Sequence, residues 1–276
     1  MRLILLTLIT MCAFAANSLL TRAAVEGGHI GPGAFAVLRV AAGAMTLGSI
    51  ALLRGATLPL LRRVRIVGAV SLTAYMVGFS MAYMTLDAGL GALILFGVTQ
   101  ITMFGHAAIT GQVPTARQVT GACVAFCGLV LVLWPGEESV TDPAGAALMC
   151  LAGLGWAAYT IAGRTAADPL ATTGANFILC LPLIAVLLYK SGLEADQTGM
   201  FLAVVCGAVT SGLGYALWYS VLRQMQGATA AVVQLSVPVI AIIAGAVMLG
   251  EVVTPIVMIA AALVVGGIGW SVTAKR

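Results

Sequence analysis

The sequence predicts an all-α integral membrane protein in which ten transmembrane helices form two inverted five-helix repeats. Three observations support this prediction: a composition almost free of charge, ten apolar runs, and a residue pattern that recurs along the chain. The chain has 276 residues, of which 61% are hydrophobic and 8% charged, and its mean hydropathy is +1.10. Soluble domains carry roughly a quarter charged residues, so a chain this poor in charge belongs in a bilayer.

The ten apolar runs follow one another with short loops between them. A helix needs about 20 apolar residues to cross the hydrocarbon core, whereas a membrane barrel would show alternating segments of ~10 residues. The first run follows Arg2 and looks like a signal peptide, but its pattern recurs in mid-chain, so we interpret it as the first span. The runs cover approximately residues 3–21, 34–53, 66–86, 89–110, 117–135, 144–163, 172–190, 200–222, 228–249 and 253–273.

Segments of the first half recur in the second half in the same order. Residues 14–22 return as residues 156–164 at an offset of 142, and both read aromatic-Ala-Ala-polar-(Ser/Thr)-aliphatic-x-x-Arg. Residues 78–92 return at an offset of 136 with five of fifteen positions identical, and residues 111–115 return at an offset of 139. Internal repeats of this kind are typical of transporters.

The number of spans in each half determines how the two halves are oriented. Because five is an odd number, the second half begins on the opposite side of the membrane and has an inverted topology. We therefore expect one five-helix repeat over residues 1–138 and a second, inverted repeat over residues 139–276. Sites in such folds lie near the membrane midplane between the halves.

The distribution of charge gives the orientation of the spans. With the N-terminus inside, ten of the thirteen basic residues fall in inner loops or ends, as the positive-inside rule requires. Eight of the nine acids fall outside, and only Asp168 lies inside. We therefore predict a multi-pass protein of a bacterial-type inner membrane with both termini in the cytoplasm.

Several other classes of protein do not fit the sequence. Nucleic-acid binding is disfavoured because the basic residues sit in short loops between spans. The six cysteines lie in apolar runs with no C-x-x-C pair, so neither a metal site nor a cofactor is expected. Ser211 and its neighbouring glycines resemble a serine-nucleophile turn, but the segment is not G-x-S-x-G and no His accompanies it. An integral-membrane enzyme is therefore the weaker alternative.

Short motifs in the second and ninth runs suggest a family. Phe35 and Arg39 form an F-x-x-x-R motif, residues 234–238 form Q-x-S-x-P, and residues 249–251 read Leu-Gly-Glu. Together with the repeated five-span unit, these motifs resemble the drug/metabolite transporter superfamily, in particular its ten-span EamA-type exporters. The resemblance covers essentially the whole chain and implies a transporter.

The first half departs from the family pattern at two positions. Thr102 stands where the repeat would place the counterpart of Pro238, and Gln112 stands where it would place that of Glu251. The two half-sites are therefore not chemically equivalent. Within the family, the aromatic-rich spans look like those of the YddG-type aromatic amino-acid exporters.

Ten polar and aromatic side chains near the middle of the runs are candidates for binding a substrate. A buried amide or phenol needs a partner, and lipid cannot supply one. A cavity lined by aromatic rings and neutral polar groups suits a flat, partly apolar solute, whereas helix–helix packing is the alternative role of the same residues. The candidates are Asn17, Tyr75, Phe79, Tyr83, Gln100, Trp156, Tyr159, Tyr215, Trp218 and Gln234.

Four more residues are candidates for gating or coupling. Arg39, roughly 9 Å into its run by helix rise, could pair with a substrate carboxylate, snorkel outward or pair with another helix. Glu251 could form a gate or a proton site, or complement the dipole of the tenth helix. His106 could couple transport to protons or only pack between helices, and Pro238 allows a kink. No Asp or Glu lies in the middle of a run, which disfavours proton exchange through a central carboxylate.

The sequence thus predicts an exporter of small metabolites that works by alternating access through a central cavity between the repeats. Aromatic or neutral amino acids are the favoured substrates, and nucleobases, nucleotide sugars or drugs are the alternatives. We expect the protein to act as a monomer, although a dimer is compatible with the sequence.

Overall fold

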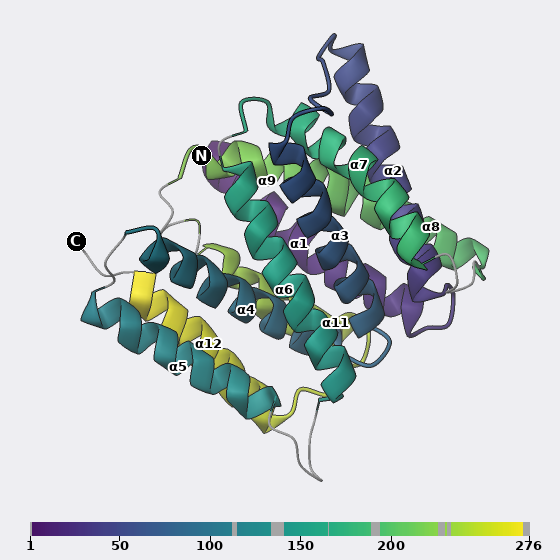
Figure 1. Cartoon of the computed structure of the whole chain (residues 1–276). Coiled ribbons are helices and arrows are strands. Elements are labelled where there is room, and N and C mark those ends of the chain that lie inside the picture. The colour runs from purple at the N-terminus through teal and green to yellow at the C-terminus, as the bar shows by residue number, and fades with distance from the viewer. Residues whose placement is uncertain are drawn as a thin grey trace.

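The computed structural model describes residues 2–111, 115–133, 141–164, 166–188, 194–225, 230 and 233–272, which form a bundle of helices (Figure 1). The predicted all-α membrane fold is confirmed. Seven helices in the described ranges are long and apolar enough to cross a membrane, and three shorter apolar helices bring the spans to ten. Outside the helices, the described backbone contains an isolated bridge between Ile30 and Ala195 and no strand.

The helices follow the predicted runs closely. In the first half they are α1 (Arg2–Val25), α2 (Pro32–Leu53), α3 (Val64–Ala82), α4 (Ala88–Ile109) and α5 (Ala116–Leu133). In the second half they are α6 (Pro143–Gly163), α7 (Pro169–Leu188), α8 (Gln197–Val205), the π-helix η1 (Cys206–Leu213), α9 (Gly214–Leu222), α11 (Ser236–Met248) and α12 (Pro255–Val272). Proline opens α2, α6, α7 and α12, where its missing N–H would have no partner within the helix.

Helices that hold corresponding places in the two halves pack against each other. The α2–α7, α4–α11 and α5–α12 pairs are all in contact, and α5 and α12 lie side by side along one flank of the bundle (Figure 1). This pairing is what two repeats that face each other would produce. The expected boundary at residues 138 and 139 lies outside the described residues, so it stays a prediction.

Two spans are less regular than the sequence suggests. The eighth span, expected as one helix, contains η1 between α8 and α9. The ninth span, expected over residues 228–249, breaks at Leu235 just before α11 begins. Pro238 therefore lies in the first turn of α11, where proline removes no helical hydrogen bond, and the expected kink is replaced by a break three residues earlier.

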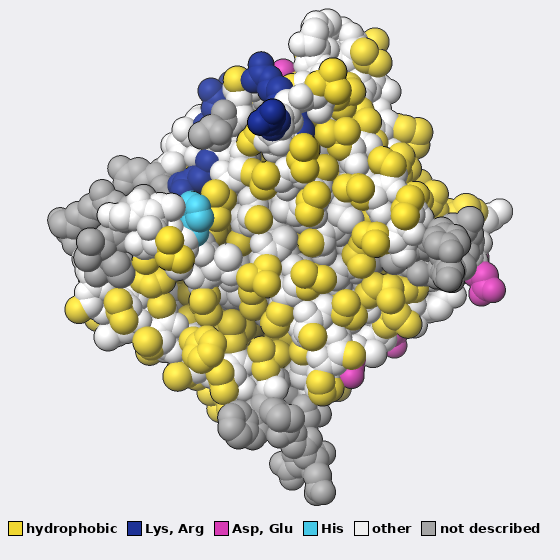
Figure 2. Space-filling model, viewed as in Figure 1, with side chains coloured by type: hydrophobic (Ala, Val, Ile, Leu, Met, Phe, Trp, Pro, Cys, Tyr) yellow, Lys and Arg dark blue, Asp and Glu magenta, His cyan; other side chains and the backbone are white. Residues whose placement is uncertain are grey.

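The two ends of the bundle carry opposite charge. At the acidic end Arg22 lies within 4 Å of Glu26, Asp87 and Glu251, at 3.8, 3.3 and 3.9 Å. The basic end is formed where α2, α6 and α9 finish and α3 begins. Figure 2 shows arginine side chains gathered at one end of the visible face and acidic side chains mainly towards the other. The described arginines of the basic end are Arg2, Arg54, Arg62, Arg63, Arg65, Arg117, Arg164 and Arg223.

Gly207 determines how closely η1 approaches α2. A Cβ at this position would run into the backbone carbonyl of Arg39, and the facing Gly43 is similarly confined by Phe177 and Gly207. The atoms that a Cβ at Gly207 would meet belong to the backbone of Arg39, which cannot move aside as the end of a flexible side chain could. We therefore expect Gly207→Ala to lower the free energy of unfolding by about 1–3 kcal/mol, as overpacking does.

A thermal unfolding measurement in detergent checks this expectation. Gly266→Ala in α12 is the matched control, because a Cβ there meets no atom within 4 Å and alanine favours helix by up to about 1 kcal/mol. Equal melting temperatures for the two variants would show that η1 can shift away from α2 at no cost.

Candidate functional site

Arg39 is the centre of a polar cluster inside the bundle, where α2, α3, η1 and α9 meet. The residue is 0% exposed. Its Nε donates to Ser211 Oγ at 2.8 Å, and its Nη2 donates to the hydroxyls of Tyr75 and Tyr215 at 3.1 and 2.9 Å. Its guanidinium carbon also lies 4.8 Å from the ring centroid of Phe79, a cation–π contact. The snorkelling alternative for Arg39 is therefore wrong.

The positive charge of Arg39 has no acidic partner among the described residues. The ion pairs found there involve Arg22 and His29, both at the acidic end. The Nη1 atom of Arg39 is buried and forms no hydrogen bond with the described residues. Because a buried charge is costly unless it is paired, this nitrogen is well suited to bind an anionic group of a ligand.

A group of aromatic rings surrounds the cluster. The ring of Phe14 in α1 packs edge-on against Trp156, Tyr215 and Trp218, with centroid distances of 5.4, 5.7 and 5.7 Å. Trp156 in turn lies 5.1 Å from Tyr75 and 4.7 Å from Tyr215. The aromatic candidates of three separate spans therefore come together around Phe14, which was not among them. Phe14 and Trp156 begin the two echoed segments, and that correspondence could have identified Phe14.

Asn17 links α1 to the π-helix. Its Oδ1 accepts hydrogen bonds from the hydroxyls of Thr210 and Ser211 at 2.7 and 2.9 Å. Ser211 also accepts from Arg39, so Asn17 positions the serine that holds the guanidinium. The role of Ser211 could not be predicted from the sequence, because it depends on the π-helical turn that directs the hydroxyl toward α1 and α2.

The cluster and its surroundings are rich in donors. The side-chain nitrogens of Gln100, Trp218 and Gln234 are buried and, like Arg39 Nη1, have no hydrogen-bond partner among the described residues. Trp156 Nε1 donates to Gln234 Oε1 at 3.5 Å, which places the glutamine beside the aromatic rings. Buried polar groups are nearly always satisfied. An acceptor-rich ligand, such as one with a carboxylate, would satisfy them.

The remaining aromatic substrate candidates, Tyr83 and Tyr159, each contact a ring of the central group. Tyr83 is buried at the acidic end, where its hydroxyl donates to the Ala88 carbonyl at 3.4 Å. Tyr159 stacks on Trp156 at 5.6 Å, and its backbone carbonyl accepts a hydrogen bond from Tyr219. His106 is exposed in the last turn of α4 and lies apart from the cluster.

Glu251 lies in the loop between α11 and α12 and contacts the other half of the chain. Its carboxylate accepts hydrogen bonds from the backbone N–H groups of Ala88 and Gly89, at 2.6 and 3.3 Å. It therefore complements the N-terminus of α4, so the expectation that it serves the tenth helix is wrong. Gln112, its counterpart in the first half, lies outside the described residues.

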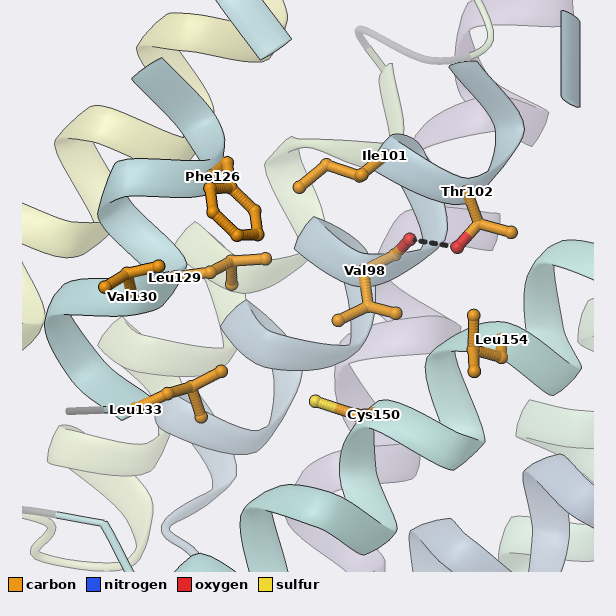
Figure 3. Close-up of a pocket in the computed structure, with 9 residues that line it drawn as sticks. All are labelled: Val98, Ile101, Thr102, Phe126, Leu129, Val130, Leu133, Cys150 and Leu154. Carbon is orange, nitrogen blue, oxygen red and sulfur yellow. Dashed lines mark hydrogen bonds between the residues drawn. The ribbon is translucent and has the colours of Figure 1, made fainter. Parts of the chain in front are cut away.

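A separate apolar groove of about 490 Å³ lies between α4, α5 and α6 (Figure 3). Its lining includes Val98, Phe126 and Leu154, and Thr102 is its one hydroxyl. That hydroxyl is already bound to the Val98 carbonyl at 2.7 Å. The groove contains none of the candidate substrate residues, and besides Thr102 its polar side chain is the thiol of Cys150.

A ten-helix bundle with a buried, donor-rich cluster between its halves defines a multi-pass membrane transporter. Residues 143–273 match the EamA-like transporter family, and the chain belongs to that family within the drug/metabolite transporter superfamily. Transporters of this family take small-molecule substrates.

Relatives of known sequence extend over most of the chain. An uncharacterized protein of Pseudomonas aeruginosa is 42% identical over 270 residues, covering 97% of this chain and 93% of that protein. An uncharacterized transporter of Archaeoglobus fulgidus is 26% identical over 223 residues, covering 78% of this chain and 79% of the relative. A solved crystal structure has the same fold, with a TM-score of 0.68 at 21% identity over 96% of each chain.

Proposed function

We propose that the protein exports small metabolites, namely amino acids with aromatic or neutral side chains, and that Arg39 binds the substrate carboxylate. The observation that carries this proposal is the complete burial of Arg39 with no acidic partner in the described part of the chain. A ligand carboxylate would offset the cost of burying the charge. The rings of Phe14, Trp156 and Trp218 would contact a flat, apolar side chain.

The burial of the cluster supports transport by alternating access. In this conformation Arg39, Tyr215 and Trp218 are each 0% exposed, so a solute cannot reach them from either end. Glu251 joins the two halves at the acidic end, and Arg65 in α3 donates to Asn176 in α7 toward the basic end. One set of contacts must open while the other stays closed, as in carriers whose halves rock about a central site.

Charge supports a definite orientation in the membrane. The described arginines outside the spans gather at the basic end, which the positive-inside rule assigns to the cytoplasm. We therefore place the protein in the bacterial inner membrane with both termini in the cytoplasm. Export then means uptake of the solute at the basic end and its release at the acidic end.

The other substrate classes fit the cluster less well. A nucleobase brings no carboxylate to Arg39, and a nucleotide sugar carries two phosphates against the single guanidinium of the cluster. A mostly apolar drug would leave the buried donors of Trp218 and Gln234 unsatisfied. An enzyme is less well supported still, because the family consists of transporters and Ser211 is engaged by Asn17 and Arg39.

Flux into liposomes that contain only this protein tests the proposal. We expect radiolabelled L-phenylalanine to cross without an imposed proton gradient, and aromatic amino acids to compete. L-Phenylalaninamide, which lacks the carboxylate, should neither cross nor compete. Equal transport of the amide would exclude Arg39 as a carboxylate site, and absence of flux by folded protein would exclude this substrate class.

A further inference from the structure

A second buried arginine lies nearer the basic end. Arg65, in the first turn of α3, is 7% exposed, whereas the neighbouring Arg62 and Arg63 are exposed. Its Nη1 donates to Asn176 Oδ1 in α7 at 3.4 Å, and its buried Nε has no partner among the described residues. Like Arg39, it forms no ion pair with a described acid.

The packing of α3 against α7 explains why this arginine turns inward. Gly68 lies one turn after Arg65, and a Cβ at Gly68 would come within 2.6 Å of Asn176 Oδ1. The absence of a side chain at Gly68 therefore lets Asn176 approach α3 and meet the guanidinium. A purely cytoplasmic arginine would remain in water, where an ammonium or guanidinium group is best solvated.

Arg65 is connected to the Arg39 cluster by neighbouring residues. Asn176 is followed by Phe177, whose ring centroid lies 6.0 Å from that of Tyr215. Tyr215 accepts a hydrogen bond from Arg39 at 2.9 Å. Arg65 and Tyr75, another partner of Arg39, are both on α3 and ten residues apart, which corresponds to about 15 Å of helix.

We propose that Arg65 and Asn176 form an access subsite, where a solute carboxylate first binds on its way from the basic end to Arg39. This inference rests on the proposed function. An attractive charge at the mouth of a site raises association rates by 10-fold or more. The weak hydrogen bond to Asn176 is the one that the Arg65 side chain forms among the described residues, and it leaves the guanidinium able to take a carboxylate and then release it to the deeper arginine.

Stopped-flow measurement of tryptophan fluorescence tests the subsite, because Trp156 and Trp218 lie beside Arg39. We expect Arg65→Gln to slow the association of L-phenylalanine about tenfold and to make that rate less sensitive to salt. Asn176→Asp should slow it similarly, since the new carboxylate would occupy the guanidinium. Arg63→Gln is the matched control, with the same loss of charge two residues away, and it should retain the wild-type salt dependence.

The outcomes separate this inference from the proposed function. If Arg65→Gln binds phenylalanine at the rate of Arg63→Gln, the access subsite is excluded while the Arg39 site stands. If Arg65→Gln is slower but keeps the full salt dependence, the residue has only a packing role and the subsite is again excluded. If the wild type gives no signal with phenylalanine, the proposed function fails and the subsite fails with it.

Discussion

Replacing Arg39 with glutamine should reduce transport of a carboxylate-bearing solute at least tenfold and leave the protein at least as stable as the wild type. A hydrogen bond to a charged group contributes about 1.5–3 kcal/mol, so affinity should fall roughly 10- to 150-fold. Stability should not fall, because the substitution removes a buried charge that has no described acidic partner. The hydroxyls it leaves behind already bond one another, Tyr215 with Tyr75 at 2.9 Å and Ser211 with Asn17 at 2.9 Å. Uptake into liposomes and the melting temperature in detergent are the two measurements.

Two further variants make this prediction specific. Arg54→Gln removes the same charge from the exposed end of the same helix and should transport normally. Arg39→Lys keeps the charge but not the planar fork that reaches three hydroxyls and a ligand, so it should recover little activity. Normal transport by Arg39→Gln would contradict the substrate site, and a large fall in its melting temperature would show that the arginine is mainly structural.

Removing the Glu251 carboxylate should weaken the contact between the two halves at the acidic end. Glu251→Ala leaves the N–H groups of Ala88 and Gly89 without their acceptor, and Arg22 without one of its acidic neighbours. The glutamate side chain is only 9% exposed, so we expect a loss of about 2–5 kcal/mol in the free energy of unfolding. Glu251→Gln retains an acceptor oxygen and should lose less. Thermal unfolding of both variants is the measurement, and a wild-type melting temperature for Glu251→Ala would contradict the expectation.

Glu251 should also make the stability of the protein depend on pH, and the pKa shift gives the direction of that dependence. Burial raises the pKa of Glu251 above its ordinary value of 4.5, although the two N–H groups oppose the shift. The folded protein therefore binds this proton more tightly than the unfolded chain does. The stability contributed by Glu251 should fall as pH rises from 4.5 through the raised pKa, and this fall should disappear in Glu251→Gln.

Asp142 provides a control of opposite sign. The N–H of Gly145 and then the Thr85 hydroxyl lower the pKa of Asp142 from its ordinary value of 3.8. Its contribution to stability is present above that value and is lost as pH falls through the lowered pKa. We expect the decrease in stability with pH above 4.5 to be absent in Glu251→Gln. If it is absent in Asp142→Asn instead, Glu251 is not the group responsible.

The sequence predicted the spans because their physical cause is local. An apolar run of fixed length needs only the bilayer to become a helix, so the ends of α2 and α6 were placed within two residues. The end of α3 at Ala82 was missed by four residues, because Tyr83, Met84 and Thr85 are apolar enough to continue a run but form a turn.

The arrangement of the site was harder to predict because it depends on contacts between distant helices. Mid-span placement alone identified Tyr75, Trp156 and Tyr215, which the structure brings together. It could not reveal that Arg39 bonds residues 36, 172 and 176 positions away. Glu251 illustrates the same limit, since its position before α12 suggested the wrong helix as its partner. The binding of a substrate by these residues remains a prediction.

We expect the buried guanidinium of Arg39 to make transport sensitive to membrane potential. A unit charge that crosses 100 mV changes in energy by about 2.3 kcal/mol, as much as a charge-assisted hydrogen bond. Any rearrangement that moves Arg39 along the membrane normal therefore works with or against the voltage. A bound monocarboxylate would cancel that charge, whereas a zwitterion brings its own ammonium and leaves the charge in place. Voltage would thus act on the loaded carrier when the solute is a zwitterion. It would act only on the empty carrier when the solute is a monocarboxylate.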